Sequence, residues 1–148
     1  MTIVTRWRMF APYLLSLLRI VAAFVFIPFG TAKLFAFPAS IMPDGSTVPP
    51  ASLIGVAAIL EAFGGLLLLL GLFTRPVAFV LAGEMAFAYF IGHAPMGFWP
   101  VLNMGAPAVL FCFIWLYISS AGPGPWSLDA AMRGSTSVTG QGRSHVRP

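Results

Sequence analysis

Six polar residues stand inside otherwise apolar stretches of this sequence and are the candidates for chemistry: Arg19, Lys33, Glu61, Glu84, His93 and Asn103. An ionisable side chain within an apolar segment is costly, so it marks either a functional site or a buried ion pair. Together, these carboxyl, cationic, imidazole and amide groups suit a pocket for a quinone headgroup, a proton relay or a small substrate. No catalytic residue can be assigned among them.

A metal site is not predicted. Cys112 is the single cysteine, and His93 is the one histidine outside the C-terminal tail. A zinc site needs several such ligands at defined spacing, and these two residues do not provide them. A lone cysteine within an apolar stretch is expected to be a small apolar filler.

Four apolar blocks must position the polar residues. The chain is 59% hydrophobic and 8% charged, whereas a soluble domain carries about a quarter charged residues. A membrane-spanning helix needs ~20 mostly apolar residues, and the blocks predict spans at residues 12–37, 51–72, 76–98 and 100–120. We therefore predict an all-α, polytopic membrane protein, a four-helix bundle within a single domain over residues 1–133.

Basic residues outside the blocks stand before the first block, between the second and third, and after the fourth: Arg6, Arg8, Arg75, Arg133, Arg143 and Arg147. The other two connections contain no lysine or arginine. By the positive-inside rule, both termini are expected in the cytoplasm. Because the basic residues are scattered, they form no patch for nucleic acid, and the lipid bilayer is the expected partner.

The depth of each polar residue follows from the helical rise of 1.5 Å per residue. Counted from the cytoplasmic end, Arg19 lies ~10 Å and Glu84 ~12 Å into the membrane, and Glu61 lies ~16 Å in, near the midplane. The matched depth of Arg19 and Glu84 predicts that these two residues compensate each other. Lys33 and His93 are expected in the outer third, ~25–30 Å up, and Asn103 opens the fourth span at that level.

Two interpretations of these residues stay open. In the first, Arg19–Glu84 and either Lys33–Glu61 or Lys33–His93 are pairs that fix the register of the helices. In the second, the same residues line a polar pocket between the helices. The sequence gives both about equal support.

The segment after the fourth block is rich in residues that end helices. Gly122–Pro123–Gly124–Pro125 cannot continue a helix, so the fourth span must end there. Ser127 is expected to cap a short helix over residues 128–133 that lies on the membrane, with Asp129 in its first turn. Residues 134–148 are polar and lack hydrophobic periodicity, which predicts a disordered cytoplasmic tail.

Several ordered motifs resemble the DoxX family. They are the run from Glu61 to Pro76 (EAFGGLLLLLGLFTRP), Arg19 with Gly30–Thr31–Ala32–Lys33, His93–Ala94–Pro95–Met96–Gly97–Phe98 with Asn103, and Gly122–Pro123–Gly124–Pro125–Trp126–Ser127–Leu128–Asp129. The resemblance covers the chain up to about Arg133. It implies a four-helix protein of the bacterial inner membrane, loosely connected with redox work. Relatives often carry a glutamate where this chain has Ala106. If that carboxylate takes part in a relay in relatives, this chain lacks it.

These observations lead to one expected function and two alternatives. We expect a small subunit or partner of a membrane redox system, with a quinone between the helices near Lys33, Glu61, Glu84 and His93. A non-enzymatic scaffold or assembly factor is the first alternative. A small-molecule transporter is the second, and it would need a homo-oligomer to enclose a pathway. Whether the protein is an enzyme stays undecided, as do its redox partners and its oligomeric state.

Overall fold

The computed structural model describes residues 3–140, and this part of the chain is helical, without strands. The all-α prediction is thus confirmed. The first helix, α1 (Ile3–Phe35), begins well before the predicted residue 12. It ends where Ala36 adopts a positive φ of 53°, which a helix does not tolerate. With 33 residues, α1 is about 50 Å long and exceeds the ~30 Å of the hydrocarbon core.

The second predicted span is a continuous helix of three parts, α2 (Leu53–Ile59), the π-helical turn η1 (Leu60–Gly64) and α3 (Gly65–Leu70). It begins where the Ser52 hydroxyl accepts a hydrogen bond from the Gly55 N–H at 3.0 Å. It ends at Gly71, which adopts a left-handed φ of 69°. The Leu72 N–H then donates to the Leu67 carbonyl at 2.9 Å, which completes a Schellman motif.

The third span contains α4 (Thr74–Ala88), a second π-helical turn η2 (Tyr89–His93) and the short 3₁₀ helix η3 (Ala94–Met96). Its beginning is capped from a distance. The Asp129 carboxylate accepts hydrogen bonds from the N–H groups of Phe73 and Thr74, each at 2.9 Å. These donors are left without partners at a helix start, so the distant carboxylate satisfies them.

The fourth helix, α5 (Ala106–Ala121), is shorter than predicted. The predicted start at residue 100 is wrong because residues 97–105 form a turn that Asn103 holds together. Its side-chain amide donates to the Gly97 carbonyl at 2.6 Å, and its side-chain oxygen accepts from the Gly105 N–H at 2.8 Å. Within residues 3–140, three helices are long and apolar enough to cross a membrane, and α5 is apolar but has 16 residues. That all four helices cross the membrane stays a prediction.

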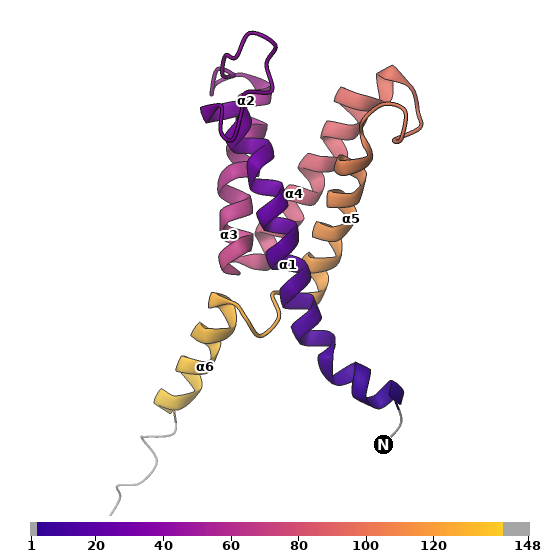
Figure 1. The fold of residues 1–148 in the computed structure, drawn as a ribbon. Coiled ribbons are helices and arrows are strands. Elements are labelled where there is room, and N and C mark those ends of the chain that lie inside the picture. The colour runs from indigo at the N-terminus through magenta and orange to yellow at the C-terminus, as the bar shows by residue number, and fades with distance from the viewer. Residues whose placement is uncertain (1–2, 141–148) are drawn as a thin grey trace, which may run out of the picture.

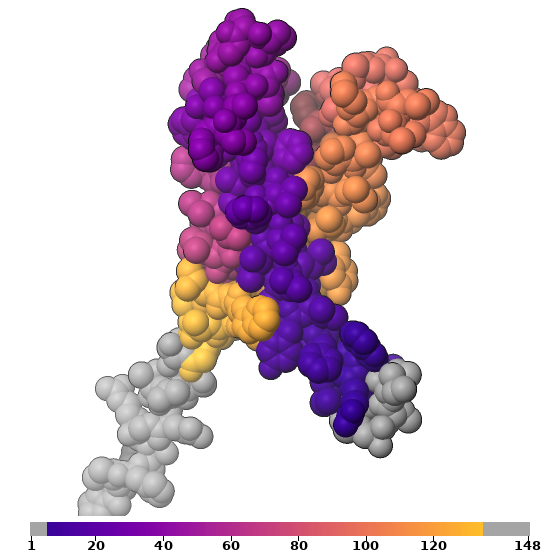
Figure 2. Space-filling model, viewed as in Figure 1, coloured from indigo at the N-terminus to yellow at the C-terminus, as the bar shows by residue number. Residues whose placement is uncertain are grey.

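The helices form two arms that diverge toward one end of the molecule (Figure 1). The first arm holds α2 and α3 beside α1, and the second holds α4 packed against α5. We name the end that carries the connections 36–52 and 97–105 the open end, since a hollow separates the arms there (Figure 2). The N-terminal part of α1 and helix α6 lie at the opposite end, which we name the closed end (Figure 1).

Large buried side chains fill the space where the arms meet. Phe26 of α1 contacts Phe111 and Trp115 of α5, with ring centroids 4.9 and 5.4 Å apart. Leu68 and Leu81 complete this core from α3 and α4. This core holds the two arms together, and the arms diverge from it toward the open end (Figure 1).

The last helix, α6 (Leu128–Gly140), extends past the predicted end at residue 133. It therefore includes residues 134–140 of the predicted disordered tail. Residues 141–148, which contain Arg143 and Arg147, lie outside the described part of the chain. The disorder and cytoplasmic placement expected for them stay predictions.

Candidate ligand site between the helices

Lys33 and Glu61 form an ion pair between the first two spans. Lys33 lies in the last turn of α1, and its Nζ is 2.6 Å from both Oε1 and Oε2 of Glu61. The side chains are 17% and 5% exposed, so both charges are largely removed from solvent. This is one of the pairs that the sequence allowed, and the long lysine side chain reaches inward to make it.

The two π-helical turns change which residues share a face. A π turn contains an extra residue, so it rotates everything beyond it by about 100° relative to an α-helix. His93 stands nine positions after Glu84, about 180° away on an uninterrupted α-helix. The extra residue in η2 reduces this to about 80°. His93 therefore lines the same cavity as Glu84.

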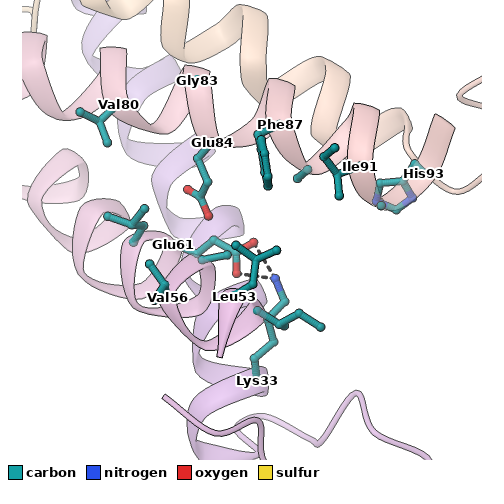
Figure 3. A pocket seen from close by; sticks show the side chains of 15 residues that line it. Lys33, Leu53, Val56, Glu61, Val80, Gly83, Glu84, Phe87, Ile91 and His93 are labelled. Atoms are coloured by element: carbon teal, nitrogen blue, oxygen red, sulfur yellow. Dashed lines mark hydrogen bonds and ion pairs between the residues drawn. The ribbon is translucent and has the colours of Figure 1, made fainter. Parts of the chain in front are cut away.

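This cavity lies between the arms and has a volume of about 570 Å³. We name it the large cavity. Four polar residues, Lys33, Glu61, Glu84 and His93, border it (Figure 3). The rest of its lining is apolar and comes from α2, η1, α4 and η2: Leu53, Ile54, Val56, Ala57, Leu60, Val80, Gly83, Phe87, Ala88, Ile91 and Gly92. The volume is within the range of ligand pockets, ~300–1,000 Å³.

Within the large cavity, Glu84 has a carboxyl group without a hydrogen-bond partner. Both of its carboxyl oxygens are buried and have no hydrogen-bond partner. The side chain points across the cavity toward Glu61 and Lys33 (Figure 3), and it interacts electrostatically with both. One lysine thus faces two carboxyl groups. A buried polar group without a partner costs about 1–3 kcal/mol, so Glu84 is where a ligand with a hydrogen-bonding group would be stabilised.

A second cavity, of about 250 Å³, lies on the other side of the ion pair, and we name it the small cavity. It shares Lys33, Glu61, Ala88 and His93 with the large cavity. Its remaining lining comes from α1, α4, α5 and the turn before α5: Phe26, Phe29, Met85, Met104, Pro107, Ala108 and Phe111. The shared polar residues therefore stand between two spaces.

Asn103 supports the site without lining either cavity. Its backbone oxygen lies 3.0 Å from Nδ1 of His93, and its side chain holds the turn between Gly97 and Gly105. Asn103 is 2% exposed. It is therefore a positioning residue for the imidazole. That Asn103 belongs to a functional site stays a prediction.

Arg19 belongs to a different cluster, and its predicted pairing with Glu84 is wrong. Arg19 is fully buried, and its guanidinium donates to the backbone oxygens of Pro123 at 2.9 Å and Leu69 at 2.8 Å. It also donates to the backbone oxygens of Leu68 and Trp126. The last carbonyls of a helix lack partners within that helix, so Arg19 satisfies the end of α3 rather than a carboxylate.

Asp129 completes this cluster at the closed end. Partial burial by itself raises the pKa of Asp129, but the hydrogen bonds from Thr74 and Phe73 outweigh it and hold the pKa below its ordinary value. Asp129 also interacts electrostatically with Arg19. Together these contacts join the end of α3, the start of α4 and the beginning of α6. Asp129 thus anchors the beginning of α6 to the start of α4.

The apolar lining of the large cavity was not predicted from the sequence. Gly83 and Gly92 were a usable signal in the sequence, because both stand inside an apolar stretch predicted to be helical. In the structure they lie on α4 and η2, and a Cβ at either position would meet nothing within 4 Å. A glycine in a helix interior is unfavourable by itself. Two of them beside Glu84 and His93 indicate a face kept free of side chains.

The fold and cavity define a helical membrane protein with a ligand-sized space among its helices. Residues 14–94 match the DoxX family, and the chain belongs to this family. It is 45% identical over 123 residues to an uncharacterized protein of Haemophilus influenzae, covering 81% of this chain and 91% of the relative. It is 28% identical over 128 residues to "Inner membrane protein YphA" of Escherichia coli, covering 80% and 89%. No solved structure matches the chain. The protein is therefore a bacterial membrane protein of the DoxX family.

Proposed function

We propose that this DoxX protein is a quinone-binding subunit or partner of a redox system in the bacterial inner membrane. The observation that carries the proposal is the large cavity, about 570 Å³ with an apolar lining and the unpartnered carboxyl group of Glu84 beside the Lys33–Glu61 pair. An amphiphile with a polar ring and an apolar tail fits such a space. Quinones have this form and dissolve in the bilayer that surrounds the helices.

The polar residues can satisfy both redox forms of a quinone. The Lys33 ammonium has three N–H donors, and two of them point to the oxygens of Glu61, which leaves one for a quinone carbonyl. The hydroxyl of a quinol can donate to Glu84, whose oxygens are otherwise unpartnered. Reduction of a quinone to a quinol takes up two electrons and two protons. In this proposal a redox partner protein supplies the electrons, and the chain supplies binding and proton-exchanging groups.

Quinone retention tests the proposal. The protein is purified in mild detergent, and bound quinones are extracted and quantified for the wild type, Glu84→Gln and Glu61→Gln. Because a hydrogen bond to a charged group contributes about 1.5–3 kcal/mol, Glu84→Gln should lower quinone content at least tenfold while the thermal melting of the protein stays nearly unchanged. If the wild type holds no quinone and the variants are destabilised, the result would support the scaffold alternative instead.

A steric variant makes the same test independent of charge. Gly83 lines the large cavity, and a Cβ added there would meet no atom within 4 Å. Gly83→Phe should therefore fill the cavity and exclude the quinone without disturbing the packing. Gly134→Phe is the matched control, since Gly134 on α6 has equal space and does not line the cavity. Equal quinone content in the two variants would contradict the proposed location.

We also propose that the closed end faces the cytoplasm. The basic residues of the sequence support this orientation. Both described chain ends lie at the closed end (Figure 1), so they share one side of the membrane. In a Cys112→Ala background, a cysteine at Asp44 should react with a membrane-impermeant reagent from the outer face, and a cysteine at Arg75 from the cytoplasmic face. Reaction of the cysteine at position 44 from the cytoplasm alone would reverse the orientation.

A further inference from the structure

We propose that the small cavity is a hydrated proton path, through which His93 exchanges protons between the quinone in the large cavity and the open end of the molecule. The inference rests on the proposed function, because it assigns a route to the protons that quinone chemistry consumes or releases. It adds water as a second ligand, and it names the open end as the side with which protons are exchanged.

The first argument is the position of the shared residues. Lys33, Glu61 and His93 border both cavities, so a proton moving between these spaces passes groups that can bind it. Glu84 lines the large cavity but not the small one. The order from quinone to small cavity is therefore Glu84, then the Lys33–Glu61 pair and His93.

The second argument is the hydrogen bonding of His93. Its Nδ1 lies 3.0 Å from the Asn103 carbonyl oxygen, which only accepts, so Nδ1 carries the hydrogen in the neutral ring. Nε2 is then the unprotonated nitrogen. No hydrogen bond to Nε2 occurs among the described residues, so this atom is free to take up a proton. The turn held by Asn103 fixes the ring in this orientation.

The third argument is that water suits the small cavity. A cavity holds water when it has the space and offers two to four polar partners. The small cavity provides about 250 Å³ and an ammonium, a carboxylate and an imidazole. Met104, which also lines it, is 76% exposed at the open end. The large cavity has about twice the volume and is bordered by more apolar side chains, which suits a lipid-soluble ligand.

Cysteine accessibility tests the water path without reference to quinone. In the Cys112→Ala background, Ala108→Cys places a thiol in the lining of the small cavity. Ala78→Cys is the matched control, since Ala78 is fully buried on α4 and lines neither cavity. A charged, membrane-impermeant methanethiosulfonate should modify position 108 at least tenfold faster from the open-end side than from the other side, and faster than position 78. Equal, slow rates at positions 108 and 78 would overturn the path. Ala88→Cys, at the border of both cavities, repeats the test if Ala108→Cys does not fold.

The role of His93 is tested by the rate of quinone reduction. Purified protein with bound quinone is mixed with the one-electron reductant dithionite, so that the quinone takes two electrons from the reductant and two protons from the path. The quinone that His93→Ala retains should be reduced at least tenfold more slowly than the quinone in the wild type, and added imidazole should restore the rate. An unchanged rate in His93→Ala with quinone bound would overturn this inference alone. Absence of quinone from the wild type would overturn the proposed function. The water path would then still be tested by the cysteine-accessibility experiment.

Discussion

Removal of the Lys33 ammonium is the perturbation whose energetic consequence the structure defines best. In Lys33→Met, Glu61 loses the cation that lies 2.6 Å from both of its oxygens. Glu61 and Glu84 then face each other across the large cavity with no compensating charge among the described cavity residues. Removing one partner of a buried ion pair costs about 3–5 kcal/mol, and we expect a loss of this size for Lys33→Met.

Substitution of Glu61, the other partner of the ion pair, should cost less stability. In Glu61→Gln, Lys33 loses its direct partner, but Glu84 still interacts electrostatically with the ammonium from across the cavity. We therefore expect Glu61→Gln to lose clearly less stability than Lys33→Met. The double variant Lys33→Met with Glu61→Gln removes both charges of the pair and should recover part of the loss, because no unpaired charge from that pair stays buried.

The free energy of unfolding of these variants can be measured by circular dichroism during unfolding with SDS in mixed detergent micelles. A second cycle, Arg19→Met with Glu84→Gln, is the control, because Arg19 bonds to backbone oxygens and not to Glu84. Its double variant should show additive losses within ~0.5 kcal/mol. Additivity in the Lys33–Glu61 cycle, or strong coupling in the control cycle, would refute the assignment of partners.

Two further predictions concern the helix ends and helix contacts. Asp129→Ala removes the cap of α4 and should cost about 1 kcal/mol of stability. The pKa of Asp129 is lower in the folded than in the unfolded protein. The stability that the carboxylate contributes is therefore present above its unfolded pKa of ~3.9 and is lost as the pH falls through the folded value. Thermal melting of wild type and Asp129→Ala should therefore converge in acid, and a constant difference would contradict the cap. Gly30→Ala should cost about 1–3 kcal/mol, because its Cβ would lie 2.5 Å from the Ala58 oxygen and the Ala62 nitrogen. Gly83→Ala, with open space around it, should melt no lower than the wild type.

The helical content of this protein follows from its composition, since long apolar runs with few charges allow little else in a bilayer. The helix ends were harder to predict, because they depend on contacts from distant segments. The start of α4 is an example, since the Asp129 carboxylate that caps it comes from α6. The start of α5 is set locally. Pro107 suits the first turn of a helix and not its interior, and the amide of Asn103, bonded to Gly97 and Gly105, holds the turn before Ala106.

That these residues form a site stays a prediction, whereas the pairing predicted between Arg19 and Glu84 is wrong. Counting rise along ideal helices gave Arg19 and Glu84 the same depth, yet depth says nothing about rotation around a helix or about competing acceptors. The carbonyls left at the end of α3 are acceptors that a count of charged residues does not include. The π-helical turns at Glu61 and His93 are a second omission. They shift the face of each helix, and no periodicity of 3.6 reveals them.

The contrast between the two polar clusters is the reason for placing function at the open end. At the closed end, Arg19 and Asp129 bond to backbone groups that would otherwise lack partners, and these contacts join three helices. Structure alone accounts for their presence. Glu84, which lies between the arms, has no such account, because it joins nothing, its oxygens are unpartnered, and it faces a second carboxylate. A neutral side chain at position 84 would relieve that cost, so the carboxyl group is best explained by a ligand that uses it.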